Sequence, residues 1–138
     1  YSYLGLRWIL LRLYLTRGVG FFEQDFFFYP DFIMWIKKKN KQIITFVDPK
    51  GLIFIGDLDH PKLKLHELLK HDIQNKLNNP NIKLDAFIIS NTSYEKVKIR
   101  YPQQPMSKAQ YEQDKHILFQ YITEGNPDPS YIKWIFTE

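Results

Sequence analysis

Three charged residues, Asp31, Asp48 and Lys50, are of the types that a metal-assisted hydrolytic site requires. Two carboxylates that converge on one spot repel each other unless a proton or a cation lies between them. Oxygen ligands without Cys or His favour a hard cation, Mg²⁺ or Mn²⁺. Such an ion activates water and neutralises charge on a phosphate. A lysine beside it adds a positive charge that stabilises the transition state or places the water.

A β-hairpin predicted over residues 29–51 would bring these three residues together. Side chains alternate faces along a strand, so the Asp-x-Lys spacing points both charged groups the same way. The lysine-rich residues 37–42 form the tip, and pairing about it places Ile36 near Ile43. The two aspartates, 48 − 31 = 17 positions apart, are then expected at the same far end of the hairpin.

The same residues also allow a purely structural interpretation. An Asp that follows Pro at a strand start often serves as a turn or cap residue. Asp-Pro-Lys-Gly is in addition an ordinary turn sequence. Because Pro49 cannot donate to a ladder, the second strand is expected to end, bulge or lie at a sheet edge there.

Longer blocks resemble a known family. Pro30-Asp31 followed by Asp48-x-Lys50 resembles the PD-(D/E)xK signature of restriction-endonuclease-like nucleases. The blocks FFEQDFFFYPDFIMWI, QIITFVDPKGL, LDAFIIS and HILFQYI resemble the C-terminal nuclease domain of DEAD/DEAH-box helicase proteins of the type III restriction (Res) subunit kind. The resemblance covers residues 10–135.

This resemblance implies an Mg²⁺-dependent (or Mn²⁺-dependent) DNA endonuclease domain, joined to a helicase/ATPase domain in the same polypeptide. It makes Asp31 and Asp48 the metal ligands and Lys50 the catalytic lysine. In the family a glutamate on a helix before the first strand commonly completes the site. Seven residues precede Trp8 and none is acidic, so we expect a fragment that lacks this helix. Glu23 is a possible additional acid, and a catalytically inactive DNA-binding or assembly module is the alternative.

The other expected elements complete an α/β fold. Strands are predicted at residues 8–15, 84–90 and 115–121, helices at 62–77, 107–114 and 131–136, and an extended piece at 97–101. After the long helix, the strand at 84–90 is expected to pair in parallel with an earlier one. We therefore expect a restriction-endonuclease-like core, a mixed sheet flanked by helices, as a single domain over residues 1–138.

Lysines at the hairpin tip and on the long helix are candidate contacts to a nucleic-acid backbone: Lys38, Lys39, Lys64 and Lys70. A lysine-rich tip is also commonly a solvated turn that protects a sheet edge. His66 and His71 are five positions apart, which does not fit a helical metal pair. Both are expected at the surface or facing DNA. Asp57 and Asp59 are expected to serve as cap or turn residues before Pro61.

Composition narrows the class of protein. The chain has 138 residues, 44% of them hydrophobic, with no cysteine and a net charge of +4. It can therefore bury a core, has no thiolate metal site, and permits a polyanionic partner. Without a signal peptide or a membrane-spanning segment we expect a cytoplasmic protein. The sequence has no phosphate-cradling glycine loop, so we expect ATP to bind elsewhere in the parent protein and expect no small-molecule cofactor here.

A serine hydrolase is a further, less favoured alternative. Ser90 or Ser93 with His60 or His116 would supply the residue types of a triad. The sequence contains no Gly-x-Ser-x-Gly elbow, which argues against this class.

Overall fold

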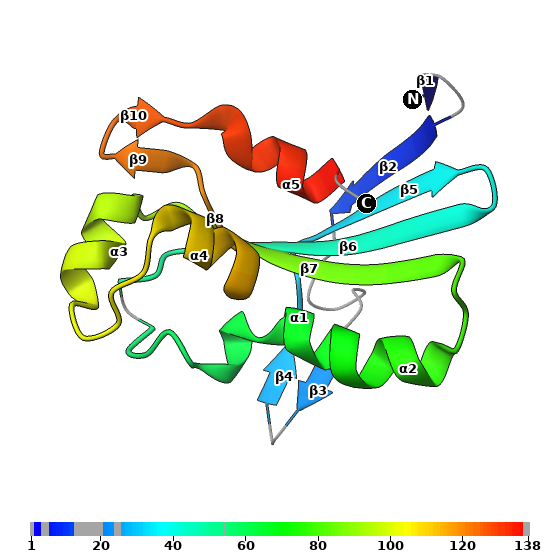
Figure 1. Cartoon of the computed structure of the whole chain (residues 1–138), viewed down its shortest axis with the longest axis horizontal. Coiled ribbons are helices and arrows are strands. Elements are labelled where there is room, and N and C mark those ends of the chain that lie inside the picture. The colour runs from blue at the N-terminus through cyan, green and yellow to red at the C-terminus, as the bar shows by residue number, and fades with distance from the viewer. Residues whose placement is uncertain (1, 4–5, 13–20, 24–25, 54, 137–138) are drawn as a thin grey trace.

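A six-stranded mixed sheet, in the order β1-β2-β5-β6-β7-β8, is the main element of the protein (Figure 1). The computed structural model describes residues 2–3, 6–12, 21–23, 26–53 and 55–136. The sheet contains β1 (Ser2–Tyr3), β2 (Leu6–Arg12), β5 (Phe32–Lys38), β6 (Lys41–Lys50), β7 (Ile82–Ser90) and β8 (Ile117–Phe119). Two separate antiparallel pairs are β3 (Phe21–Glu23) with β4 (Phe26–Phe28), and β9 (Tyr121–Thr123) with β10 (Asn126–Pro127).

Helices lie on both faces of this sheet (Figure 1). They are the 3-10 turn η1 (Pro61–Leu63), α1 (Leu65–Leu68), the π-helical η2 (Leu69–Ile73), α2 (Gln74–Leu77), α3 (Tyr94–Arg100), α4 (Lys108–Asp114), the 3-10 turn η3 (Pro129–Tyr131) and α5 (Ile132–Phe136). Leu65 and Leu69 pack on one face against Phe46. Ile135 of α5 packs on the other face against Val47. The predicted α/β class, a mixed sheet flanked by helices, is confirmed.

The hairpin of β5 and β6 has the predicted register. Ile36 lies opposite Ile43, and the tip is the two-residue turn Lys39-Asn40, where Lys39 has a positive φ of 51°. Strand β6 then pairs in parallel with β7 after the helical crossover, as predicted. The central strand therefore has an antiparallel neighbour on one side and a parallel neighbour on the other.

Pro49 does not end the second strand of the hairpin, contrary to one part of the expectation. Strand β6 continues through Pro49 to Lys50, in parallel register with β7. On its other side the last antiparallel pair is Phe32 with Val47. Continuing that register places Pro30 opposite Pro49, and neither proline can donate a hydrogen bond. The missing donor thus coincides with the end of β5.

The long predicted helix extends over nearly its expected length but contains a π-helical turn. Leu65, Leu69 and Ile73 contact the core, because side chains four positions apart lie on one helix face. Asn78 ends the helix in a left-handed conformation with φ 46°. A π-helical turn inside an α-helix is uncommon and is frequently found beside functional sites.

In the second half of the chain one prediction was wrong, and another, the strand at 115–121, is confirmed only over Ile117–Phe119. Residues 97–101 are not extended, because Ser93 caps a helix there by accepting a hydrogen bond from the Lys96 amide. The strand expected at 115–121 is interrupted, because His116 has a positive φ of 52° and only Ile117–Phe119 pairs with β7. The helix with Ser107 as its cap is confirmed and has a complete capping box.

None of the helices in the described ranges is both long enough and apolar enough to cross a bilayer.

Candidate functional site

Asp31 and Asp48 lie opposite each other at the open end of the β5–β6 hairpin. Asp31 precedes β5 directly, and the register that pairs Phe32 with Val47 brings it level with Asp48. Both side chains are on the sheet face that carries α1, since Ile33 and Phe46 on that face belong to the α1 core. The charge of Asp31 acts on the Asp48 carboxyl group and raises its pKa, so the two acids are close enough to interact. The predicted convergence of these aspartates is present.

Lys50 completes this cluster on the same face. Its Nζ atom lies 2.8 Å from Oδ2 of Asp48, and about a third of the lysine side chain is exposed (33%). The backbone after it is held in place, because the Asn91 amide donates to the Lys50 carbonyl at 3.1 Å. The Leu52 amide donates to Oγ1 of Thr92 at 3.0 Å. The lysine therefore sits where the parallel strands β6 and β7 both end, the edge at which open α/β sheets commonly bind ligands.

Asp48 is the buried member of the cluster. Its side chain is 2% exposed, whereas Asp31 is exposed. Burial is the largest influence and raises the pKa of Asp48, while the neighbouring Lys50 ammonium and the Asp31 backbone amide lower it. Neither carboxylate oxygen accepts a hydrogen bond of regular geometry from the described residues. The Lys50 ammonium compensates this buried charge at Oδ2, and a cation bound between Asp48 and Asp31 would compensate it further.

The donor set fits a hard divalent cation. Mg²⁺ is usually held by one or two carboxylates, and it keeps several waters and binds substrate phosphates with its other positions. Asp31 and Asp48 supply two such carboxylates. No group of three or more His, Cys, Asp or Glu suited to a metal ion occurs among the described residues. A cation at this site would therefore rely on water and substrate oxygens for the rest of its coordination.

The other predicted site residues do not join this cluster in the described structure. The backbone of Glu23 ends β3, and its side chain lies outside the described part of the molecule. Lys38 and Lys39 are at the hairpin tip. Lys39 precedes Asp48 by nine positions, so the tip lies about 30 Å from Asp48 along the strand. Lys64 lies 3.7 Å from Asp59, and Lys70 is exposed on the π-helical turn.

Several other residues that the sequence analysis considered form local hydrogen bonds in turns and helix caps. Oδ1 of Asp57 accepts a hydrogen bond from the Asp59 amide, which confirms the predicted turn role. Ser90 Oγ donates to the Thr92 carbonyl at 2.7 Å, and Ser93 caps α3. His60 Nδ1 accepts from the Lys62 amide. These bonds engage Ser90, Ser93 and His60 in local structure, whereas His116 contacts Asp85.

His66 was predicted at the surface but is buried. It stacks on His116 with ring centroids 4.3 Å apart, and His116 in turn contacts Asp85 at 3.0 Å. A signal for its burial existed, because Leu69 and Ile73 follow it by three and seven positions and therefore share its helix face. His71 is exposed, as expected. No pattern in the sequence indicated that His116 and Asp85 would be in contact.

Comparison with protein-family models, with curated proteins and with solved structures found no match to the chain.

Proposed function

We propose that this chain is a metal-dependent nuclease domain that hydrolyses phosphodiester bonds in DNA. The observation that carries the proposal is the cluster in which Asp31 lies opposite Asp48 and Lys50 contacts Asp48 at 2.8 Å. The order β2-β5-β6-β7, with a helical crossover before the parallel fourth strand, supports it as well. This is the arrangement that a restriction-endonuclease-like core would have.

Each member of the cluster has a distinct role in the proposed reaction. Asp31 and Asp48 hold Mg²⁺ or Mn²⁺, and when bound the ion activates water and neutralises charge on the scissile phosphate. Lys50 supplies a fixed positive charge that stabilises the phosphate in the transition state or orients the attacking water. The burial of Asp48 excludes water from one side of the site, which strengthens these electrostatic interactions. DNA and a helicase motor as partners are part of the same proposal.

Calorimetric titration of Mn²⁺ tests the site directly. We expect saturable binding to the parent chain and its loss in both Asp31→Asn and Asp48→Asn, because each removes one anionic ligand. Asp72→Asn is the matched control, since among the described residues Asp72 pairs with Lys76 alone, on the helix surface. Plasmid nicking in Mg²⁺ would follow the same pattern. Undiminished Mn²⁺ binding in both site variants would reject the assignment.

The alternative, a catalytically inactive DNA-binding module, is favoured by one observation. The Lys50 ammonium already neutralises the Asp48 carboxylate, so the charge of Asp48 is compensated without a metal ion. Such a module would bind DNA through phosphate contacts alone. Salt-dependent DNA binding in EDTA that survives Asp31→Asn combined with Asp48→Asn, without any Mn²⁺ binding by the parent, would establish it.

A further inference from the structure

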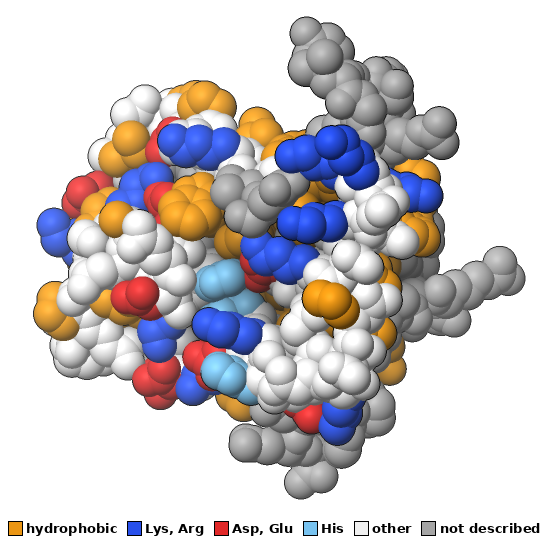
Figure 2. Space-filling model, turned by 45° about the vertical axis from the view of Figure 1, so that its right-hand side comes forward, with side chains coloured by type: hydrophobic (Ala, Val, Ile, Leu, Met, Phe, Trp, Pro, Cys, Tyr) orange, Lys and Arg blue, Asp and Glu red, His pale blue; other side chains and the backbone are white. Residues whose placement is uncertain are grey.

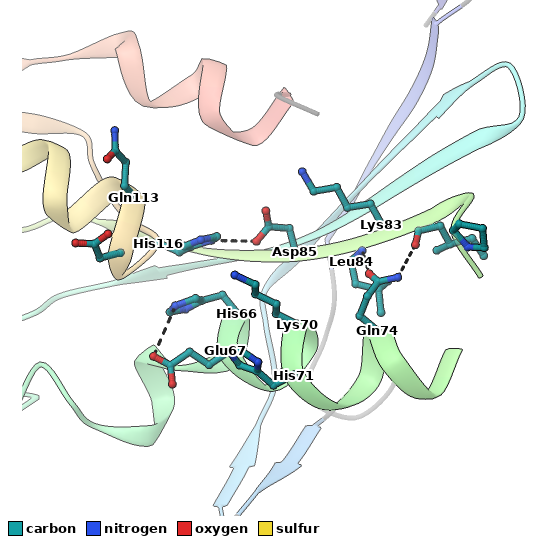
Figure 3. A pocket seen from close by; sticks show the side chains of 13 residues that line it. His66, Glu67, Lys70, His71, Gln74, Lys83, Leu84, Asp85, Gln113 and His116 are labelled. Atoms are coloured by element: carbon teal, nitrogen blue, oxygen red, sulfur yellow. Dashed lines mark hydrogen bonds and ion pairs between the residues drawn. The ribbon is translucent and has the colours of Figure 1, made fainter. Parts of the chain in front are cut away.

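An open cavity of about 820 Å³ lies along the exposed edge of β7, outside the Asp31–Asp48–Lys50 cluster. Its walls are the α1–η2–α2 helix, the first half of β7 and the end of α4 (Figure 3). Figure 2 shows histidine side chains in a hollow of this face, with basic side chains around them. Its volume falls in the range that small-molecule sites occupy, about 300–1,000 Å³.

His116 is held in one tautomer by two oxygen atoms at the edge of β7. Nδ1 of His116 lies 3.0 Å from Oδ1 of Asp85 and 3.1 Å from the Ala86 carbonyl oxygen. Both neighbours are acceptors, so Nδ1 carries the proton. Asp85 is itself fixed, because its Oδ1 accepts the Ala86 amide hydrogen at 2.8 Å. In the neutral ring this tautomer leaves Nε2 of His116 as a hydrogen-bond acceptor, and no described residue donates to it.

Aromatic stacking fixes the same ring from both faces. His66 stacks on one side at 4.3 Å with an interplanar angle of 7°, and Phe87 lies on the other side at 4.9 Å. A ring held by two stacked neighbours and by Asp85 keeps its orientation without a ligand. Preorganisation of this kind reduces the entropy cost of binding.

Charged side chains of both signs line the cavity. Lys70 on the helix and Lys83 on β7 form no ion pair with any described residue. Figure 3 shows Lys70 extending from the helix toward the strand. Among the acids, Asp85 contacts His116, and Oε1 of the partly exposed Glu67 lies 3.9 Å from Nε2 of His66. Asp114 lines the cavity at the end of α4. A ligand that matches this pattern carries an anionic group, a hydroxyl group and hydrogen-bond donors.

We propose that this cavity binds the phosphate ester of a nucleotide. Lys70 and Lys83 contact the phosphate group, Nε2 of His116 accepts a hydrogen bond from the sugar hydroxyl, and Glu67 or Asp114 accepts from an amino group of the base. Asp85 is a positioning residue that acts through His116. The nucleotide is either free in solution or the terminal nucleotide of a nucleic-acid strand. The proposal does not depend on the nuclease function, because none of these residues belongs to that cluster.

The test uses the full chain carrying Asp31→Asn and Asp48→Asn, so that any nuclease activity is removed. The imidazole signals of the four histidines are followed by NMR during titration with AMP, adenosine, inorganic phosphate and a short oligonucleotide with or without a 5′-phosphate. We expect the His116 signals to shift saturably with AMP but not with adenosine. Lys70→Ala combined with Lys83→Ala should weaken AMP binding at least tenfold. Lys76→Ala, on the same helix but outside the cavity, is the control.

The outcomes separate the possibilities. A response to AMP alone identifies a free nucleotide as the ligand, and an equal response to the 5′-phosphorylated oligonucleotide identifies a strand end. Asp85→Asn should weaken binding and also move the His116 Nδ1 signal in the free protein, which loss of a merely structural contact elsewhere would not do. Equal shifts with adenosine and AMP, or a response to inorganic phosphate as strong as to AMP, would overturn the proposal.

Discussion

The Lys50 ammonium group lies 2.8 Å from Oδ2 of Asp48, two positions earlier on the same strand and almost fully buried. This contact joins the two charged groups that the Asp-x-Lys spacing pointed the same way. The contact also determines how much stability a substitution of Lys50 or Asp48 removes. A buried charge that loses its partner destabilises a fold more than the intact pair stabilises it.

We expect Lys50→Met to lower the free energy of unfolding by about 2 kcal/mol at pH 7, since it leaves the Asp48 carboxylate buried without its cation. Asp48→Asn should cost less, because it removes the buried charge itself. In the double variant the two losses should not add, and the cycle should give a coupling energy of about 1 kcal/mol. Urea unfolding in EDTA measures all four proteins. Simple additivity would show that the contact contributes little.

The pH dependence of the same variants follows from the raised pKa of Asp48. A carboxyl group whose folded pKa is above its unfolded value binds a proton more readily in the fold. Its contribution to stability is therefore present at acid pH and is lost as the pH rises through the raised pKa. Stability measured from pH 3 to pH 7 should decline less in Asp48→Asn than in the parent. An unchanged profile would mean that Asp48 does not titrate differently in the folded chain.

The hairpin tip should matter only for long DNA. Because the tip lies about 30 Å from Asp48 along the strand, a duplex bound at the cluster reaches it only when it is longer than about nine base pairs. Lys38→Ala with Lys39→Ala should therefore weaken binding of a 24-base-pair duplex and reduce its salt slope by about 0.9 for each lost phosphate contact. An 8-base-pair duplex should be unaffected. Lys98→Ala on α3 serves as the control, and equal effects on both duplexes would exclude this geometry.

The hairpin was predictable because its information is local. Alternating apolar side chains and a polar tip determine the register, so the pairing of Ile36 with Ile43 followed from the sequence. The pairing of His116 with Asp85 was not predictable, since it depends on a left-handed residue that interrupts the strand expected at 115–121. The helix at Tyr94–Arg100 was not predicted, because Ser93, its cap, lies in a polar segment that was interpreted as a loop.

His66 should make the protein sensitive to acid. Burial is the main cause that lowers the pKa of His66 to about 4, and the adjacent His116 lowers it further. A histidine with a depressed folded pKa contributes stability above its unfolded pKa of 6.5, and this is lost as the pH falls toward 4. The shift corresponds to about 3 kcal/mol as an order of magnitude. His66→Phe, which retains a stacking ring, should flatten the stability profile between pH 7 and pH 4.

The exposed His71 provides the control for that experiment. His71→Phe should leave the acid profile unchanged, because the wild-type side chain is in solvent in both states. If His66→Phe and the parent lose stability in parallel between pH 7 and pH 4, the acid sensitivity arises elsewhere in the chain.

Gln74 closes part of the edge of β7 that β8 does not cover. Its Nε2 atom donates to the Ile82 carbonyl at 2.7 Å, and its Oε1 atom accepts from the Leu84 amide at 2.8 Å, so one side chain replaces two ladder hydrogen bonds (Figure 3). Gln74→Ala should lower the free energy of unfolding by about 1–3 kcal/mol, since both backbone groups lose their partner.

The same substitution should also promote self-association, because an uncovered strand edge pairs readily with another chain. Sedimentation velocity at increasing concentration would detect the resulting dimer, and amide exchange would locate the new protection on β7. Asn75→Ala is the matched control: it is adjacent on the helix and makes one exposed bond to the His71 carbonyl. If Gln74→Ala remains monomeric and as stable as Asn75→Ala, the edge is protected by the neighbouring helix and not by this amide.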